Sequence, residues 1–259
     1  MLAFGALAAM PLAWFLAGKL HRFAYWIGRK TDAQVAALAR DGWSVERLEV
    51  EPGVKLVGLV RAPRRPDAPW ILFAPGNSSA QLDGFQHELD QLLQGQDHGV
   101  AFFAYRGFDA SDGTPTPAAL GADLERQWRW LRERGVAAEQ IEIWGYSLGT
   151  VLAANLAVAV RKHNETPRRV VLLAAAEHIP VMRAGCCGRF LPDDVFAIDE
   201  RFRDIPTVLV HGAEDDALPI AGARALQARC GTSATLHELP GRGHVDLWAD
   251  ARRILFTAR

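Results

Sequence analysis

The chain has few cysteines and almost no net charge. Its 259 residues include 3 cysteines, and 29 Lys and Arg against 30 Asp and Glu give a formal net charge of −1. The weak overall field argues against nucleic acid as a partner. Cys186, Cys187 and Cys230 have neither metal-ligand spacing nor the even number of a disulfide framework. We expect buried or inert thiols, with a lipidated or redox-active Cys186–Cys187 pair as the alternative.

Signals for metal or phosphate chemistry are also missing. His211 is followed by Asp215 and Asp216, but one histidine beside two acids is not a ligand set of recognised spacing. The glycine-containing segment 145–149 lacks the Gly-Lys-Ser/Thr ending of a phosphate-binding loop. The sequence therefore predicts no metal and no cofactor.

Length and composition favour one folded domain behind an N-terminal segment. Two small domains would fit into 259 residues, but α/β folds often use this length as one, and 49% hydrophobic residues allow a sizeable core. No internal repeat or Pro/Ser-rich linker marks a second domain. We divide the chain into residues 1–30, an apolar segment with a basic linker, and residues 31–259, the folded domain.

The N-terminal segment predicts association with a membrane. Residues 1–18 carry no charge, and as a helix they would extend about 27 Å, which nearly spans a bilayer. No positive residue precedes the segment and no small-residue cleavage site follows it, which disfavours a cleaved secretory signal. If the segment spans, the basic residues after it should keep the folded domain cytoplasmic: Lys19, His21, Arg22, Arg29 and Lys30. Since Pro11 and Gly18 weaken a full span, a helix lying on the membrane or packed on the domain is the alternative.

From residue 70 onward the chain repeats an apolar strand followed by an amphipathic helix. This alternation predicts an α/β fold with a mostly parallel central sheet and helices on both faces. A helix at 32–40 and a strand pair at 45–50 and 54–60 precede the repeat. The expected strands are 70–74, 100–105, 141–146, 169–175, 207–211 and 235–239, and the expected helices are 84–94, 117–134, 150–160, 221–230 and 246–256.

One long segment interrupts this alternation. Residues 177–204 contain Gly185, Gly188 and Pro192, and they follow a strand at the carboxyl edge of the sheet, where ligands bind in such folds. The segment is predicted to form a small lid. The tryptophans of the regular elements are expected in the core or at an interface rather than in a substrate cage: Trp128, Trp130, Trp144 and Trp248.

Ser147 is the strongest candidate for chemistry. The apolar strand 141–146 runs into Gly145-Tyr146-Ser147-Leu148-Gly149, and a helical segment follows at once. A Gly-x-Ser-x-Gly sequence between strand and helix forces the serine into a strained backbone conformation and exposes its hydroxyl above the sheet. This arrangement predicts a nucleophile.

A serine nucleophile requires a base, and His244 is best placed to be one. Histidine titrates near neutral pH, and Gly241-Arg242-Gly243-His244 forms a turn just beyond the last strand. A carboxylate must then orient the imidazole, and Asp215 follows strand 207–211 at the same edge. The order Ser147, Asp215, His244 fits this sheet type. Asp216 stays open as the carboxylate, with Glu214 as a further competitor, while Asp246 is expected to cap the last helix.

The oxyanion formed during acyl transfer needs preorganised N–H donors. The amide of Leu148, directly after the nucleophile, is one donor by geometry. The second should come from the loop after strand 70–74, which reads Pro75-Gly76-Asn77-Ser78-Ser79. Asn77 is the first choice and Ser78 the second.

The chain resembles the α/β-hydrolase superfamily over nearly its whole length from about residue 45. The resemblance rests on five ordered blocks: residues 73–77, 105–108 and 145–149, His211-Gly212 with Asp215, and Gly243-His244. Within the superfamily, the chain is similar to the compact, N-terminally membrane-anchored serine hydrolases that include the alpha/beta-hydrolase-domain depalmitoylases. Their Asp-Tyr-Arg-Gly-Tyr-Gly-x-Ser-x-Gly block stands here at residues 104–113, with Ala104 and Asp109 in place of the usual aspartate and glycine. Pro75 stands where many relatives have histidine. The resemblance implies the α/β-hydrolase fold and leaves the loop conformations and substrate preference to be established.

The residues and the resemblance together predict a serine hydrolase. Ser147 would attack an ester or thioester, His244 would shuttle the proton, and Asp215 would orient the imidazole. The lid and the apolar N-terminus favour acylated or lipid-like substrates near a membrane, and peptide hydrolysis stays open. The alternatives are a catalytically silent scaffold at the membrane and acyl transfer to an acceptor other than water. The sequence gives no indication of oligomeric state.

Overall fold

The structure is a computed structural model that describes residue 25 and residues 27–179 and 196–256. The predicted membrane segment 1–18, the Cys186–Cys187 pair and most of the predicted lid lie outside the described residues. Within the described part, no helix combines the length and apolarity needed to cross a bilayer.

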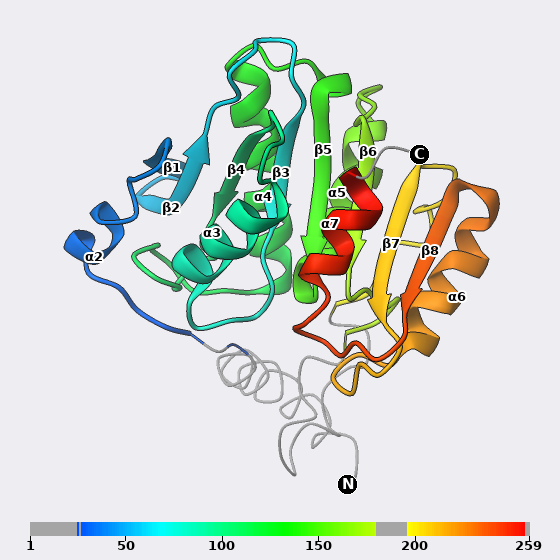
Figure 1. The fold of residues 1–259 in the computed structure, drawn as a ribbon. Helices are drawn as coiled ribbons and strands as arrows, with labels where there is room; N and C mark the ends of the chain where they lie inside the picture. Colours follow the sequence, from blue (N-terminus) through cyan, green and yellow to red (C-terminus); the bar gives the residue numbers. More distant parts are fainter. Residues whose placement is uncertain (1–24, 26, 180–195, 257–259) are drawn as a thin grey trace, which may run out of the picture.

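The described residues form one eight-stranded sheet in the order β1-β2-β4-β3-β5-β6-β7-β8 (Figure 1). The hairpin β1–β2 pairs antiparallel to β4, and β3 to β8 run parallel. This confirms the predicted mostly parallel sheet. The strands are β1 (Trp43–Glu51), β2 (Val54–Arg61), β3 (Trp70–Ala74), β4 (Gly99–Phe103), β5 (Ile141–Tyr146), β6 (Arg169–Leu173), β7 (Thr207–Gly212) and β8 (Ala234–Leu239).

Helices cover both faces of the sheet. On one face α3 and α7 pack against each other, on the other α4 packs against α5, and α6 lies along β7 and β8 (Figure 1). The helices are α2 (Asp32–Ala36), α3 (Gln81–Leu92), α4 (Pro117–Glu133), α5 (Leu148–Arg161), α6 (Ile220–Cys230) and α7 (Trp248–Phe256), with short 3₁₀ turns η1 (Ala138–Gln140) and η3 (Gly231–Ser233).

Burial explains why the central strands read as continuous apolar runs. All six residues of β5 and all five of β4 are buried, as expected for parallel strands covered on both faces. The outer hairpin strand β1 instead mixes buried and exposed positions. The four tryptophans predicted to be core residues are buried, which confirms that expectation: Trp128, Trp130, Trp144 and Trp248.

Several predicted boundaries were wrong for local physical reasons. Helix α2 ends at Ala36 rather than at residue 40, and turns lead into the left-handed Asp41 and Gly42. Strand β6 stops at Leu173 because Ala174 has φ +53°, which breaks the extended backbone. Helix α7 begins at Trp248, not at residue 246.

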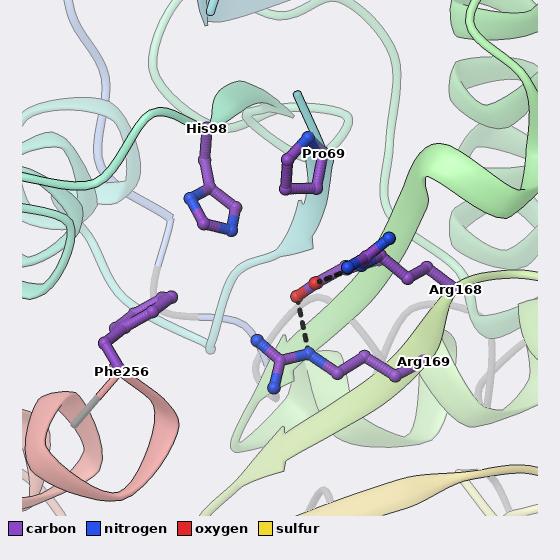
Figure 2. Close-up of a pocket in the computed structure, with 6 residues that line it drawn as sticks. Pro69, His98, Arg168, Arg169 and Phe256 are labelled. Carbon is purple, nitrogen blue, oxygen red and sulfur yellow. Dashed lines mark hydrogen bonds and ion pairs between the residues drawn. The ribbon is translucent and has the colours of Figure 1, made fainter. Parts of the chain in front are cut away.

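A cavity of about 570 Å³ lies at the amino ends of β3, β5 and β6, the sheet edge opposite Ser147 (Figure 2). Its buried acid Glu142 accepts from Arg169 Nε at 2.8 Å and from Trp144 Nε1 at 2.9 Å. Arg168 Nε lies 3.4 Å from the other carboxylate oxygen. Because Glu142 in β5 binds Arg169 at the start of β6 and pairs with Arg168 just before that strand, we assign this cluster to the stability of the fold.

Replacing Glu142 should therefore destabilise the protein without changing the sheet edge at Ser147. Glu142→Gln keeps an acceptor for the Trp144 indole but leaves two arginines without their counter-charge, so we expect a loss of about 1–3 kcal/mol of unfolding free energy. Equilibrium urea denaturation measures it, with the exposed Glu139→Gln as matched control. Equal unfolding free energies for the two variants would contradict the assignment.

Candidate active site

Ser147 occupies the turn between β5 and α5 in a strained conformation. Its φ of +51° and ψ of −119° lie outside the regions that a non-glycine residue normally adopts. The flanking glycines make the turn sterically possible. A Cβ on Gly149 would lie 1.9 Å from the Ala74 carbonyl oxygen, and one on Gly145 would lie 2.4 Å from the Gly149 oxygen. The Gly-x-Ser-x-Gly spacing is thus required by close backbone packing under Ser147.

The structure brings Ser147, His244 and Asp215 into one hydrogen-bonded chain. His244 Nε2 lies 2.9 Å from Ser147 Oγ, and His244 Nδ1 lies 2.7 Å from Asp215 Oδ2. An ionised carboxylate only accepts hydrogen bonds, so Nδ1 carries the proton and Nε2 is the acceptor for the serine hydroxyl. Three residues separated by up to 97 positions therefore have the geometry of a nucleophile, a base and an orienting acid.

Backbone contacts hold His244 over the sheet edge. Gly241 has φ +72°, which turns the chain back after β8. Gly212, at the end of β7, faces this loop so closely that a Cβ there would lie 2.3 Å from the Arg242 carbonyl oxygen. Tyr146 donates from its hydroxyl to the His244 carbonyl oxygen at 2.9 Å. The residue before the nucleophile thus fixes the loop that carries the base.

Asp215 is distinguished from its acidic neighbours by burial and by its donors. Asp215 is buried, whereas its neighbours Glu214 and Asp216 are exposed. Its Oδ1 accepts from the amides of Ala217 at 3.0 Å and Leu218 at 2.7 Å, while Oδ2 faces His244. Of the acids left open by the sequence, Asp215 is the one in contact with the imidazole.

The charge of Asp215 is strongly stabilised. Burial alone would raise its pKa, but hydrogen bonds from His211, His244 and the Leu218 amide together hold the pKa of this carboxyl well below its usual range. His211 is fully buried, with Nε2 3.4 Å from Asp215 Oδ2 and 2.8 Å from the Leu218 carbonyl oxygen. This histidine, considered above for a metal, lies against the acid and the loop that holds it.

Asp246 does not have the role predicted for it. Its Oδ1 accepts from the Gly243 amide at 2.7 Å and closes the turn before His244. Helix α7 begins only two residues later, at Trp248. A short acid just before a helix is typical of a cap, but the bond that Asp246 forms here is to the neighbouring turn. Asp246 supports the His244 loop instead.

The loop that carries Asn77 lies beside Ser147. A Cβ on Gly76 would be 3.4 Å from the Ser147 Cβ. Buried Gln81 ties this loop to the next strand connection, because its Nε2 donates to the Gly76 oxygen at 3.0 Å and its Oε1 accepts from the Tyr105 amide at 2.9 Å. The Tyr105 hydroxyl donates to the Pro75 oxygen at 2.5 Å.

The two predicted oxyanion donors belong to segments that meet at the serine. Leu148 opens α5, where the first amides have no partner within the helix. The side chain of Ser78, the second choice, accepts from the Ala80 amide at 3.3 Å. Asn77 and Leu148 stay predictions as donors.

The connection at 104–113 supports the loop beside Ser147. Arg106 is buried and forms a two-pronged pair with Asp123, with both nitrogen–oxygen distances at 2.7 Å. Burial raises the pKa of Asp123 and Arg106 partly offsets it. Ser111 Oγ donates to the Ala104 oxygen and accepts from the Val57 amide, each at 2.9 Å. These bonds fix the connection that touches the loop beside Ser147.

Sequence reasoning did not find Tyr146 or Gly212 as site-forming residues. Both act through contacts between distant segments, which spacing along the chain does not reveal. The available signals were an aromatic residue inside the serine pentapeptide and a glycine at the end of the strand that precedes Asp215.

The Gly212 contact generates a test of how the site is held. Gly212→Ala should overpack the junction between β7 and the His244 loop and cost about 1–3 kcal/mol of unfolding free energy. Gly121→Ala in α4 is the matched control: nothing lies within 4 Å of the position that its methyl group would take, and alanine favours a helix. Urea denaturation of both variants is the measurement, and a Gly212→Ala protein as stable as the control would rule out the tight contact.

One family model and several curated proteins are similar to this chain. The family described as "Chlamydia CHLPS protein (DUF818)" matches residues 57–182. Alpha/beta hydrolase domain-containing protein 17B of Homo sapiens is 30% identical over 189 residues, which cover 68% of this chain and 60% of that protein. Lysophosphatidylserine lipase ABHD12 of Danio rerio is 24% identical over 227 residues, covering 73% of this chain and 59% of that protein. The chain thus spans less than two thirds of the length of these relatives.

Solved structures agree on the fold. The crystal structure of an alpha-beta hydrolase from Vibrio vulnificus matches with a TM-score of 0.68 at 22% identity. The match covers 94% of this chain and 90% of that one.

Proposed function

Because the chain belongs to the α/β-hydrolase superfamily, we propose that it is a serine hydrolase that cleaves an ester or thioester bond through an acyl-enzyme intermediate. The observation that supports this most directly is the hydrogen-bonded chain from Asp215 through His244 to Ser147. These contacts are the ones that acyl transfer by a serine, a base and an orienting acid needs.

The geometry supports a two-step reaction. Ser147 Oγ attacks the substrate carbonyl while His244 Nε2 takes its proton, and the charge of Asp215 stabilises the imidazolium. His244 then gives the proton to the departing alcohol or thiol, which leaves an acyl group on Ser147. A water molecule, deprotonated by the same imidazole, attacks this ester and releases the acid. The amides of Leu148 and Asn77 would hold the oxyanion, each contributing about 3–4 kcal/mol to the transition state.

We further propose acylated or lipid-like compounds as substrates. The similarity to a protein named lysophosphatidylserine lipase favours an acyl-chain substrate, as does the apolar segment 1–18. Two large hydrophobic side chains are exposed among the described residues, Ile27 at 38% and Val245 at 71%. Val245 directly follows the catalytic histidine candidate.

Membrane association of the catalytic domain is part of this proposal. Tyr25 packs edge-on against Phe108 and Phe196, so the described N-terminal end lies at the edge where β5 and β7 end (Figure 1). A segment 1–18 bound to a bilayer would keep this edge near the lipid surface. The basic linker favours a cytoplasmic position for the domain.

Covalent labelling tests the nucleophile. A fluorophosphonate probe should label the wild-type protein, and Ser147→Ala should lose all labelling because it removes the hydroxyl that lies against His244. Ser233→Ala, in η3, is the matched control and should label like the wild type. Mass spectrometry of the labelled peptide identifies the site. A folded wild-type protein that never reacts would favour the silent scaffold.

A fractionation experiment tests the membrane proposal. Removal of residues 1–24 keeps every linker contact described from residue 27 onward and should move a sedimenting protein into the soluble fraction. Ultracentrifugation followed by fluorophosphonate labelling of both fractions measures the shift. Identical sedimentation of the full-length and shortened proteins would contradict membrane attachment through this segment.

A further inference from the structure

The segment just after the N-terminal apolar stretch pairs with the loop connection around Asp109. The Asp109 amide donates to the Gly28 carbonyl oxygen at 2.8 Å, and the Lys30 amide donates to the Asp109 backbone carbonyl oxygen at 3.1 Å. This is a one-residue parallel bridge between Arg29 and Asp109. The Arg29 guanidinium also donates a hydrogen bond to the Ser111 backbone carbonyl oxygen at 3.2 Å. Residues 28–30, which we call the linker strap, are therefore fixed to the domain.

Asp109 is an unusual residue for its position. Its φ is +46°, a left-handed conformation that glycine adopts most easily, and the resembling family has glycine there. The residue is buried, with 1% of its surface exposed. A buried acid in a strained conformation persists only where its surroundings hold it.

The carboxylate of Asp109 connects the linker strap to the start of α3. Its Oδ2 accepts from the Leu82 amide at 3.0 Å, in the first turn of the helix, where N–H groups and the helix dipole favour a negative charge. Its Oδ1 lies 3.9 Å from Lys30 Nζ, and the same ammonium lies 3.1 Å from Asp83. Burial raises the pKa of Asp109 to about 6, the Leu82 amide and Lys30 act to lower it, and Asp83 acts to raise it. The Lys30 ammonium thus lies closer to Asp83 than to Asp109, but it still acts to lower the pKa of this buried acid.

The linker strap also touches the loop beside Ser147 directly. A Cβ on Gly28 would lie 1.8 Å from the Ser79 carbonyl oxygen, so the strap backbone packs against residues 75–80, the oxyanion loop. Helix α3 follows this loop at once, and its first residue, Gln81, holds the Gly76 carbonyl. A continuous set of contacts therefore runs from the linker strap through Asp109 and α3 to the loop that carries Asn77.

We propose that the linker strap and Asp109 are positioning residues for the oxyanion loop, so that the chain next to the apolar N-terminus is part of the catalytic apparatus. This inference rests on the proposed serine hydrolase function. Rates of acyl transfer depend steeply on donor placement, since loss of one donor costs roughly 10²–10³-fold in kcat and a shift of about 1 Å costs up to about 10²-fold. Loosening the strap should therefore lower kcat much more than it changes KM.

Two variants of the full-length protein each change a different contact of the linker strap. Lys30→Met removes the cation that faces Asp109 and keeps the backbone bridge. Gly28→Ala places a methyl group where the Ser79 oxygen lies. We expect each variant to lower kcat about tenfold or more, with KM within about threefold of wild type, and to slow phosphonylation of Ser147 by a similar factor. Hydrogen exchange of amides 76–80 should become faster.

Matched controls separate positioning from general stability. Arg47→Met removes an exposed ion pair to Asp32 in the same region, and Gly84→Ala adds a methyl group on the exposed face of α3 with its nearest neighbour at 3.9 Å. Both should keep wild-type kcat and loop exchange. Test variants that keep wild-type kcat and loop exchange, even with a lower thermal midpoint, would overturn the proposal. A wild-type protein that neither labels nor hydrolyses any ester would overturn the proposed function instead, and loop exchange would still decide whether the strap holds the loop.

Discussion

The site depends on the sharp turn at Ser147. A serine with φ +51° stands at the end of a fully buried strand, and only glycines at positions 145 and 149 let the chain pass beneath it. The strain is compensated by the sheet, since β5 pairs with β3 on one side and β6 on the other. Because the turn exposes the hydroxyl at the carboxyl edge, every other functional group has to reach that same edge.

Two loops reach this edge by different means. The His244 loop is held by backbone proximity, through Gly212, and by the hydroxyl of Tyr146, the neighbour of the nucleophile. The oxyanion loop is held by side chains, mainly Gln81 and Tyr105. Ser147 and His244 are therefore linked through Tyr146 at the end of β5, while the loop 75–80 packs against the linker strap and the 104–113 connection.

The sequence allowed most of the architecture to be predicted, because the elements are signalled locally. The strand 70–74 and the end of β5 at Tyr146 agree with the structure, since buried parallel strands are short, apolar and bounded by turn residues. The positions of Ser147, His244 and Asp215 also followed from turn chemistry at strand ends. Spacing could not separate Asp215 from Asp216, because only the fold shows which carboxylate turns inward. Tyr146, Gly212 and Asp109 act through contacts between remote segments, and no local pattern predicts those.

A comparison of the buried acids shows why Asp215 is the carboxylate best suited to the orienting role that we propose for it. Desolvation alone would raise the pKa of each of these carboxyls. Asp109 has one amide donor and a distant ammonium, and its pKa rises to about 6. Asp123 shares a guanidinium and its pKa is still raised. Asp215 alone among these three receives two backbone amides and two histidines, which outweigh burial and keep it charged. An ionised acid is what an imidazolium formed during acyl transfer requires, so the number of donors around each acid supports Asp215 as the orienting carboxylate of the proposed reaction.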